Sequence, residues 1–287
     1  MGPPGRTIAA DDSAALHILE ARLQALLPQE YQGSYDEVEP VPMGSAGLKY
    51  DADGQVAWNE IWQTFCDLAL AGGPPHKGRL LLPGAADAIA AEPDRYAAVT
   101  GEICRGISLA TGLPSEPSAE PGWIHVGCDS AGMAGWLLRA IAMENVAVRA
   151  DDSVLDLPAA PAYRLEKEIK NVVTVIAKTC HYWAGHMWCF EQRAIADLFA
   201  EMDAESPLLV PSYPNPDWIG VPCPNVRSAV WMTRILVAGN VLARREDTVL
   251  LVPVDPVRDP HATAVQAAVA RARRLAVLKG LVEPPAG

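Results

Sequence analysis

Two stretches of the sequence concentrate side chains that can do chemistry. The first is the loop GCDSAGMAG, in which Cys128 and Asp129 follow an expected strand and precede an expected helix. Catalytic and ligand-binding groups of α/β proteins are often placed there, and a helix N-terminus lowers the pKa of a thiol. We therefore expect Cys128 or Asp129 to act as nucleophile or base. The alternative is that Cys128 is a buried packing residue and that Ser130 only caps the helix.

The second stretch is CHYWAGHMWC, at the end of a helix expected to run from about residue 163 to 188. His181 or His186 is expected to serve as the general acid or base, because histidine titrates near neutral pH. His186 and Cys189 are three residues apart and can share a divalent metal ion. The spacing matches neither HExxH nor Glu-x-x-His. The alternative is aromatic packing with histidines that face solvent.

The Cys128 loop belongs to an internal repeat. Residues 122–158 recur 95 positions later as residues 217–253, and 14 of the 36 positions from Trp123 onward are identical. The shared pattern is W-I-x-V-x-C, seven residues, then W-x2-R-x5-N-V-x2-R-x-[DE]-D-[ST]-V-L-x-[LV]-P. The chain therefore carries an internal duplication.

Several polar residues are present in both copies of the repeat. They are Arg139 and Arg234, Asn145 and Asn240, and Arg149 and Arg244. Such a duplicated set can bind a carboxylate or phosphate, with Lys178 as a further cation. The alternative is structural, with each asparagine ending a helix and each arginine paired with acids near the following turn.

The copies differ around their shared cysteine. Copy one has Gly127, Gly132 and Gly135, whereas copy two has Pro222 and Pro224 beside Cys223. Glycines let backbone amides approach a bound anion, and prolines remove amides. If one copy holds a ligand, we expect it to be copy one.

The elements around these residues suggest an α/β fold. Each copy is expected to form a β-α-β-α unit, at about 123–190 and 218–280. A strand–helix–strand crossover of this length normally joins parallel strands. The sequence thus predicts a mostly parallel sheet covered by helices, with a helical N-terminal region.

The rest of the chain is expected to be arranged around this core. Residues 1–10 should be a disordered tail, and residues 11–112 a helix-rich region in which 56–83 loosely resembles a decayed repeat. The duplicated core would span 113–287, and the proline-rich segment 203–224 would be an ordered loop. Together these parts are expected to form one compact domain.

Composition narrows the function classes. A formal net charge of −12 argues against nucleic-acid and anionic membrane surfaces. No apolar run reaches membrane-spanning length, and the N-terminus lacks the apolar segment of a signal peptide. The six cysteines form no CxxC pair, so we expect free thiols in a cytoplasmic protein.

Three functions are consistent with these patterns, one of them a metal-binding protein built on the His186 and Cys189 pair; the other two are as follows. The first is a soluble enzyme acting on a small anionic substrate, with or without a divalent metal, near the Cys128 loop and the His181/His186 helix. The second is a non-catalytic subunit that assembles as a homo- or hetero-oligomer. No cofactor-specific motif is present, and the sequence leaves the reaction and the substrate open.

Overall fold

The computed structural model describes residues 5–27, 32, 48–61, 79–186, 189–211 and 217–284. The chain divides into two compact units. Unit 1 comprises Met1–Glu37 and Leu198–Gly287, and unit 2 comprises Val38–Asp197. Each copy of the repeat therefore lies in its own unit, with copy one in unit 2 and copy two in unit 1.

Unit 2 is built on a small antiparallel sheet of order β1-β2-β4-β3. Its strands are β1 (Ser115–Pro117), β2 (Trp123–Gly127), β3 (Arg149–Asp151) and β4 (Val154–Pro158). Helix α6 (Ala131–Met143) connects β2 to β3. The side chains of Ile124, Val126, Leu155 and Leu157 are buried. Because side chains alternate along a strand, His125 and Asp156 occupy the other face of this sheet.

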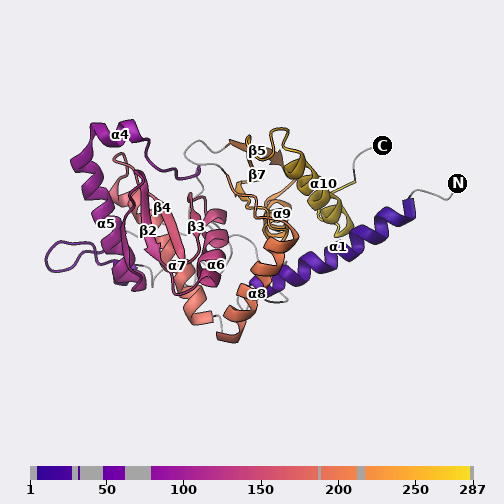
Figure 1. Cartoon of the computed structure of the whole chain (residues 1–287), viewed down its shortest axis with the longest axis horizontal. Helices are drawn as coiled ribbons and strands as arrows, with labels where there is room; N and C mark the ends of the chain where they lie inside the picture. Colours follow the sequence, from indigo (N-terminus) through magenta and orange to yellow (C-terminus); the bar gives the residue numbers. More distant parts are fainter. Residues whose placement is uncertain are drawn as a thin grey trace. The chain divides into compact units, whose positions relative to one another are not determined.

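Helices α5, α6 and α7 gather around this sheet (Figure 1). The helices of unit 2, apart from α6, are α2 (Trp58–Ile61), α4 (Ala86–Ala91), α5 (Pro93–Thr111) and α7 (Lys170–His186), with a π-helical turn at Leu165–Ile169 before α7. Helix α8 (Cys189–Glu205) runs from unit 2 into unit 1. Gly106 of α5 lies so close to α7 that an added Cβ would meet Val173 Cγ2 at 2.7 Å. Helices α5 and α7 are thus closely packed against each other at Gly106.

Unit 1 carries a second antiparallel sheet, of order β5-β7-β6. Its strands are β5 (Asp217–Pro222), β6 (Arg244–Glu246) and β7 (Val249–Val254), and its helices include α1 (Gly5–Leu26), α9 (Val226–Ala238) and α10 (Thr263–Leu278). Helices α1, α9 and α10 contact one another.

The N-terminal helix α1 is fixed to the C-terminal part of unit 1. Its buried residues Ala15, Leu19, Leu23 and Leu26 recur at helical spacing. Ion pairs join Asp12 to Arg274 at 2.8 Å, Arg22 to Glu205 at 2.6 Å, and Glu20 to Lys279. Helix α1 begins at Gly5, inside the segment expected to be a disordered tail, and residues 1–4 lie outside the described residues.

The two copies adopt the same local fold with their elements 95 residues apart. Helix α6 starts at Ala131 and α9 at Val226, and both are followed by an asparagine with positive φ, 60° at Asn145 and 63° at Asn240. The next residue forms an isolated parallel bridge in each copy, Val146 with Leu81 and Val241 with Leu209. The backbone N–H of each shared cysteine donates to the turn residue between the two hairpin strands, at 2.8 Å in both copies.

The prediction of a mostly parallel sheet built from β-α-β-α units is wrong. Every pairing between the named strands is antiparallel. The sequence prediction missed β3 and β6, which are three residues long, and merged them with the turn that follows. In unit 2 the crossover helix leads to β3, and a hairpin through Asp152 (φ 50°) then returns β4 between β2 and β3. The observed order is therefore β-α-β-β, and β2 and β3, which lie on either side of β4, run in the same direction without pairing with each other.

Other expectations are met in part. The helix expected from about residue 163 to 188 corresponds to the π-helical turn at Leu165–Ile169 and α7, which is described to His186, while residues 187 and 188 lie outside the described residues. In the proline-rich segment 203–224, α8 extends to Glu205 and β5 begins at Asp217, while 212–216 lie outside the described residues. The suggested decayed repeat at 56–83 falls largely on residues 62–78, which also lie outside them.

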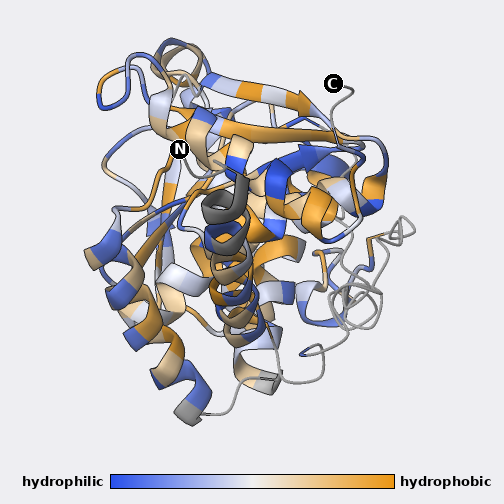
Figure 2. Cartoon of the chain, turned by 90° about the vertical axis from the view of Figure 1, so that its right-hand side faces the viewer, coloured by the Kyte–Doolittle hydropathy of each residue, from blue (hydrophilic) through white to orange (hydrophobic). Residues whose placement is uncertain are grey.

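No helix among the described residues combines the length and the apolar character needed to cross a membrane. The helices visible in Figure 2 carry hydrophilic as well as hydrophobic residues along their length. Their apolar sides pack inside each unit, as expected for amphipathic helices.

Candidate functional site

Cys128 lies directly after β2, at the position expected from the sequence. Its environment does not favour a thiolate, because burial, and secondarily the charge of Asp129, raise the pKa of its thiol to about 12. Burial, then Cys128 and Asp129, also raise the pKa of the buried thiol of Cys180. Ser130 caps α6 by accepting from the Met133 N–H at 3.1 Å, as predicted, and Asn225 does the same for α9. Among the residues described, Cys104, Cys128, Cys180 and Cys223 are free thiols.

Two of the copy-one glycines have packing roles. A Cβ on Gly132 would meet the Cβ of Ala196 in α8 at 2.7 Å, and a Cβ on Gly127 would meet Pro114 Cγ at 3.1 Å. Close approach of protein to protein therefore accounts for both glycines. The interpretation of this loop as an anion cradle gains no support from them.

Replacing Gly132 by alanine should destabilise unit 2 by about 1–3 kcal/mol, because the added methyl overlaps a packed neighbour. Urea unfolding monitored through hydrogen exchange of the α6 amides would measure the loss of stability. The matched control is Gly101→Ala in α5, where nothing lies within 4 Å of the added Cβ. That variant should be neutral or more stable by up to about 1 kcal/mol. Equal effects of the two substitutions would contradict the packing role.

The polar residues shared by the copies have structural partners. Asn240 donates through Nδ2 to Asp203 Oδ1 at 2.9 Å and to the Ser206 carbonyl at 2.7 Å. Asn145 ends α6 in the left-handed conformation, which asparagine tolerates. Arg139 is buried and donates from Nη1 to the Gly135 carbonyl at 2.9 Å, within its own helix. Arg234 lies half-buried in α9. An anion-binding role for this set stays a prediction.

Lys178 is held in an ion pair with Glu144. The side chains are 4% and 13% exposed, and the Lys178 ammonium donates to Glu144 Oε1. Glu144 follows the C-terminus of α6, whereas Cys128 precedes its N-terminus, and a helix of this length spans about 20 Å. The ammonium that was expected to meet an anionic substrate already has a carboxylate partner.

The structure describes only part of the predicted histidine and metal site. His181 is half-buried in α7, with its ring centroid 6.3 Å from that of Tyr182. His186 ends α7 and Cys189 begins α8, but their side chains lie outside the described residues. Among the described side chains no group of three potential ligands is placed to hold a metal ion.

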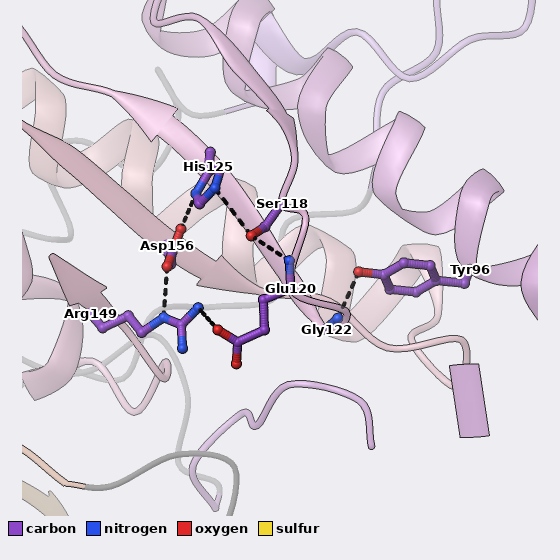
Figure 3. Close-up of polar contacts among 7 residues, drawn as sticks. All are labelled: Tyr96, Ser118, Glu120, Gly122, His125, Arg149 and Asp156. Atoms are coloured by element: carbon purple, nitrogen blue, oxygen red, sulfur yellow. Dashed lines mark hydrogen bonds and ion pairs between the residues drawn. The ribbon is translucent and has the colours of Figure 1, made fainter. Parts of the chain in front are cut away.

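A different histidine has an arrangement with catalytic character. His125 on β2 pairs in register with Asp156 on β4, and Asp156 pairs with Arg149 on β3. The His125 Nδ1 atom bonds Asp156 Oδ1, and the His125 Nε2 atom lies 3.1 Å from Ser118 Oγ (Figure 3). A carboxylate at Nδ1 assigns the ring proton to that nitrogen, so Nε2 is left to accept the serine hydroxyl proton. The His125 side chain is 40% exposed, so solutes can reach it.

Hydrogen bonds close these residues into a ring. Arg149 donates from Nε to Asp156 Oδ2 and from Nη2 to Glu120 Oε2, both at 2.6 Å. The Glu120 backbone N–H in turn donates to Ser118 Oγ at 3.1 Å. Each of Ser118, His125, Asp156, Arg149 and Glu120 thus contacts its two neighbours in the ring (Figure 3). We call this set the Ser118 ring.

The loop between β1 and β2 positions Ser118 and Glu120. The Ser118 N–H donates to the Trp123 carbonyl at 2.9 Å, which closes the loop at its base. Gly122 adopts φ 93°, and its N–H donates to the Tyr96 hydroxyl of α5 at 2.8 Å (Figure 3). A Cβ on Gly122 would meet the Gly84 carbonyl oxygen at 2.7 Å, so both its conformation and its surroundings require glycine. Helix α5 therefore anchors the loop that carries the serine.

Charge pairing sets the electrostatics of the ring. The hydrogen bond from Arg149 holds the pKa of the Glu120 carboxyl below its usual range. Burial alone would lower the pKa of Arg149, but its bonds to Glu120 and Asp156 outweigh burial and raise it. The guanidinium also lies 4.3 Å from the centroid of the Trp123 ring. Arg149 is thus a permanent cation whose charge is matched by two carboxylates.

The sequence prediction did not include the Ser118 ring, although a comparison of the copies contains its signal. At the positions of His125 and Asp156, copy two has Gly220 and Leu251. Both residues alternate with buried apolar neighbours along their strands. The same comparison that singled out the glycines near Cys128 therefore points to this polar pair as well.

Comparison with known proteins adds no name to this site. The chain matches no protein family, no curated protein and no solved structure. Any function must therefore be argued from the residues themselves.

Proposed function

We propose that unit 2 is an enzyme of the hydrolase class, with Ser118 as nucleophile, His125 as general base and Asp156 as the carboxylate that orients it. The observation that carries this proposal is the chain of contacts from Ser118 Oγ through both ring nitrogens of His125 to Asp156. The same three roles support nucleophilic catalysis on several unrelated folds. Cys128 is a weaker candidate because its raised pKa keeps the thiol protonated at neutral pH.

The proposed reaction is hydrolysis of a small carboxylic ester. Ser118 Oγ attacks the carbonyl carbon while its proton passes to His125 Nε2, and the imidazolium is stabilised by Asp156. The proton then passes to the leaving alcohol as the carbon–oxygen bond breaks. Water, deprotonated by His125, releases the acyl group and restores Ser118.

We propose a neutral substrate for this site in place of the anionic one expected from the sequence. Arg149 is the cation of the ring, and Glu120 and Asp156 already compensate its charge. An incoming carboxylate or phosphate would have to displace one of these acids. The cytoplasmic location inferred from composition remains part of the proposal.

The closed form of the Ser118 ring favours one alternative, a non-catalytic subunit. The ring ties the β1–β2 loop to β4 and β3, so it could serve only to brace the sheet. In that case Ser118 would have no more reactivity than an ordinary serine hydroxyl.

A fluorophosphonate probe, which modifies activated serines, separates the two functions. The full chain should acquire one adduct, mapped by mass spectrometry to Ser118, and Ser118→Ala should abolish it. His125→Ala should slow the labelling by at least about 100-fold, since the general base is lost. Control variants are Ser153→Ala in the β3–β4 turn and His261→Ala, an exposed residue of unit 1. If the wild-type chain is not labelled, the hydrolase proposal is wrong, and the alternative of a ring that only braces the sheet is favoured.

A further inference from the structure

Arg149 has a counterpart in the second copy, and the two arginines share one contact. The Arg149 guanidinium lies 4.3 Å from the ring centroid of Trp123, and that of Arg244 lies 4.8 Å from the ring centroid of Trp218. Both arginines also start the second strand of their repeat, β3 and β6. Stacking on tryptophan is therefore a property of the repeated fold and is independent of any reaction.

The histidine and the carboxylate beside Arg149 occur only in copy one. At the positions of His125 and Asp156, copy two has Gly220 and Leu251, while Ser118 and Glu120 precede the repeat. Arg244 pairs with Glu246 of its own strand, at 2.7 Å. Of the two arginines, Arg149 is therefore the one that shares a carboxylate with a histidine of the neighbouring strands.

These contacts constrain both ends of the proposed catalytic chain. By holding Asp156 Oδ2, Arg149 stops the carboxylate from rotating and leaves Oδ1 for the His125 ring. By holding the Glu120 side chain, it fixes the residue whose backbone N–H donates to Ser118 Oγ. The Nε–H and Nη2–H groups of one guanidinium can hold both carboxylates in place, because the planar group fixes the positions of its donors relative to each other.

We propose that Arg149 is the positioning residue of the Ser118 ring, setting the orientation and tautomer of His125 through Asp156 and that of Ser118 through Glu120. This inference rests on the proposed function for its effect on rate, but its effect on the histidine ring is independent of it.

Arg149 is the cation among the groups that surround the histidine. The charged or titratable groups around His125 are Asp156 on β4, Arg149 on β3, Glu116 opposite it on β1, and Glu120 in the β1–β2 loop. Removing Arg149 leaves the Asp156 carboxylate able to rotate and takes away the contact that holds the Glu120 side chain, so the His125 ring and the Ser118 hydroxyl should lose their fixed positions.

The test compares Arg149→Met with its matched control Arg244→Met, which removes the same tryptophan stack from unit 1. Arg149→Met should slow fluorophosphonate labelling of Ser118 on the order of 100-fold. Arg149→Lys should restore only part of the rate, because lysine has the charge without the two fixed donors of the guanidinium. Arg244→Met should leave the rate unchanged.

Two outcomes would overturn the inference: an Arg149→Met chain with the wild-type labelling rate, or an equal loss in Arg244→Met. If wild-type Ser118 is not labelled at all, the hydrolase proposal fails, and nitrogen NMR of the His125 ring then decides the positioning role. The proposal expects an Nδ1–H tautomer in the wild-type chain that is lost in Arg149→Met. The same tautomer in both chains would reject it.

Discussion

Replacing Asp156 by asparagine should lower the turnover of an ester substrate by about 10⁴-fold while the chain stays folded. An amide side chain cannot stabilise the imidazolium, and it can present its N–H₂ group to His125 and so invert the ring tautomer. Nε2 would then carry the proton and could not accept the one on Ser118 Oγ. The measurement is kcat for hydrolysis of a p-nitrophenyl ester, together with the thermal midpoint of the variant.

The matched control is Asp151→Asn, which removes a carboxylate from the exposed end of β3 in the same sheet. It should change kcat less than about threefold, since surface substitutions away from a site have small effects. A kcat for Asp156→Asn within tenfold of wild type would mean that the carboxylate does not orient a catalytic base. The Ser118 ring would then be read as a brace of the hairpin.

Local features were predictable from the sequence because each depends on neighbouring residues. The helix cap at Ser130 was predicted from residue type and position, and its side chain accepts the Met133 N–H as expected. The left-handed asparagines ending α6 and α9 correspond to the suggested structural role of the shared Asn145 and Asn240.

The sheet and the candidate site were not predictable in the same way, because both depend on strand pairing. Strand β4 shows the same apolar alternation whether its neighbour is parallel or antiparallel, and β3 is too short for a periodic signal. Only the observed register brings His125, Asp156 and Arg149 into one row. His125 and Asp156 are 31 positions apart in the sequence, and no local pattern predicts that they are in contact.

Replacing Lys178 by methionine should destabilise unit 2 by about 3–5 kcal/mol, the second large effect we expect. The ammonium is 4% exposed and its carboxylate partner Glu144 is 13% exposed. Methionine has a similar length and fits the apolar part of the site, so the cost comes from leaving a buried carboxylate without its counter-ion. Native-state hydrogen exchange of the α7 amides measures it, because these amides report on unit 2.

Two further variants show whether the ion pair itself is responsible. Lys167→Met removes a lysine that is 65% exposed and lies 3.8 Å from Glu168, and an exposed pair of this kind should cost less than about 1 kcal/mol. The double variant Lys178→Met/Glu144→Leu removes both buried charges and should recover at least about half of the loss, because an apolar pair of similar volume needs no counter-ion. If the double variant were as unstable as Lys178→Met alone, the loss would come from packing and Lys178 would again be available for a ligand-binding role.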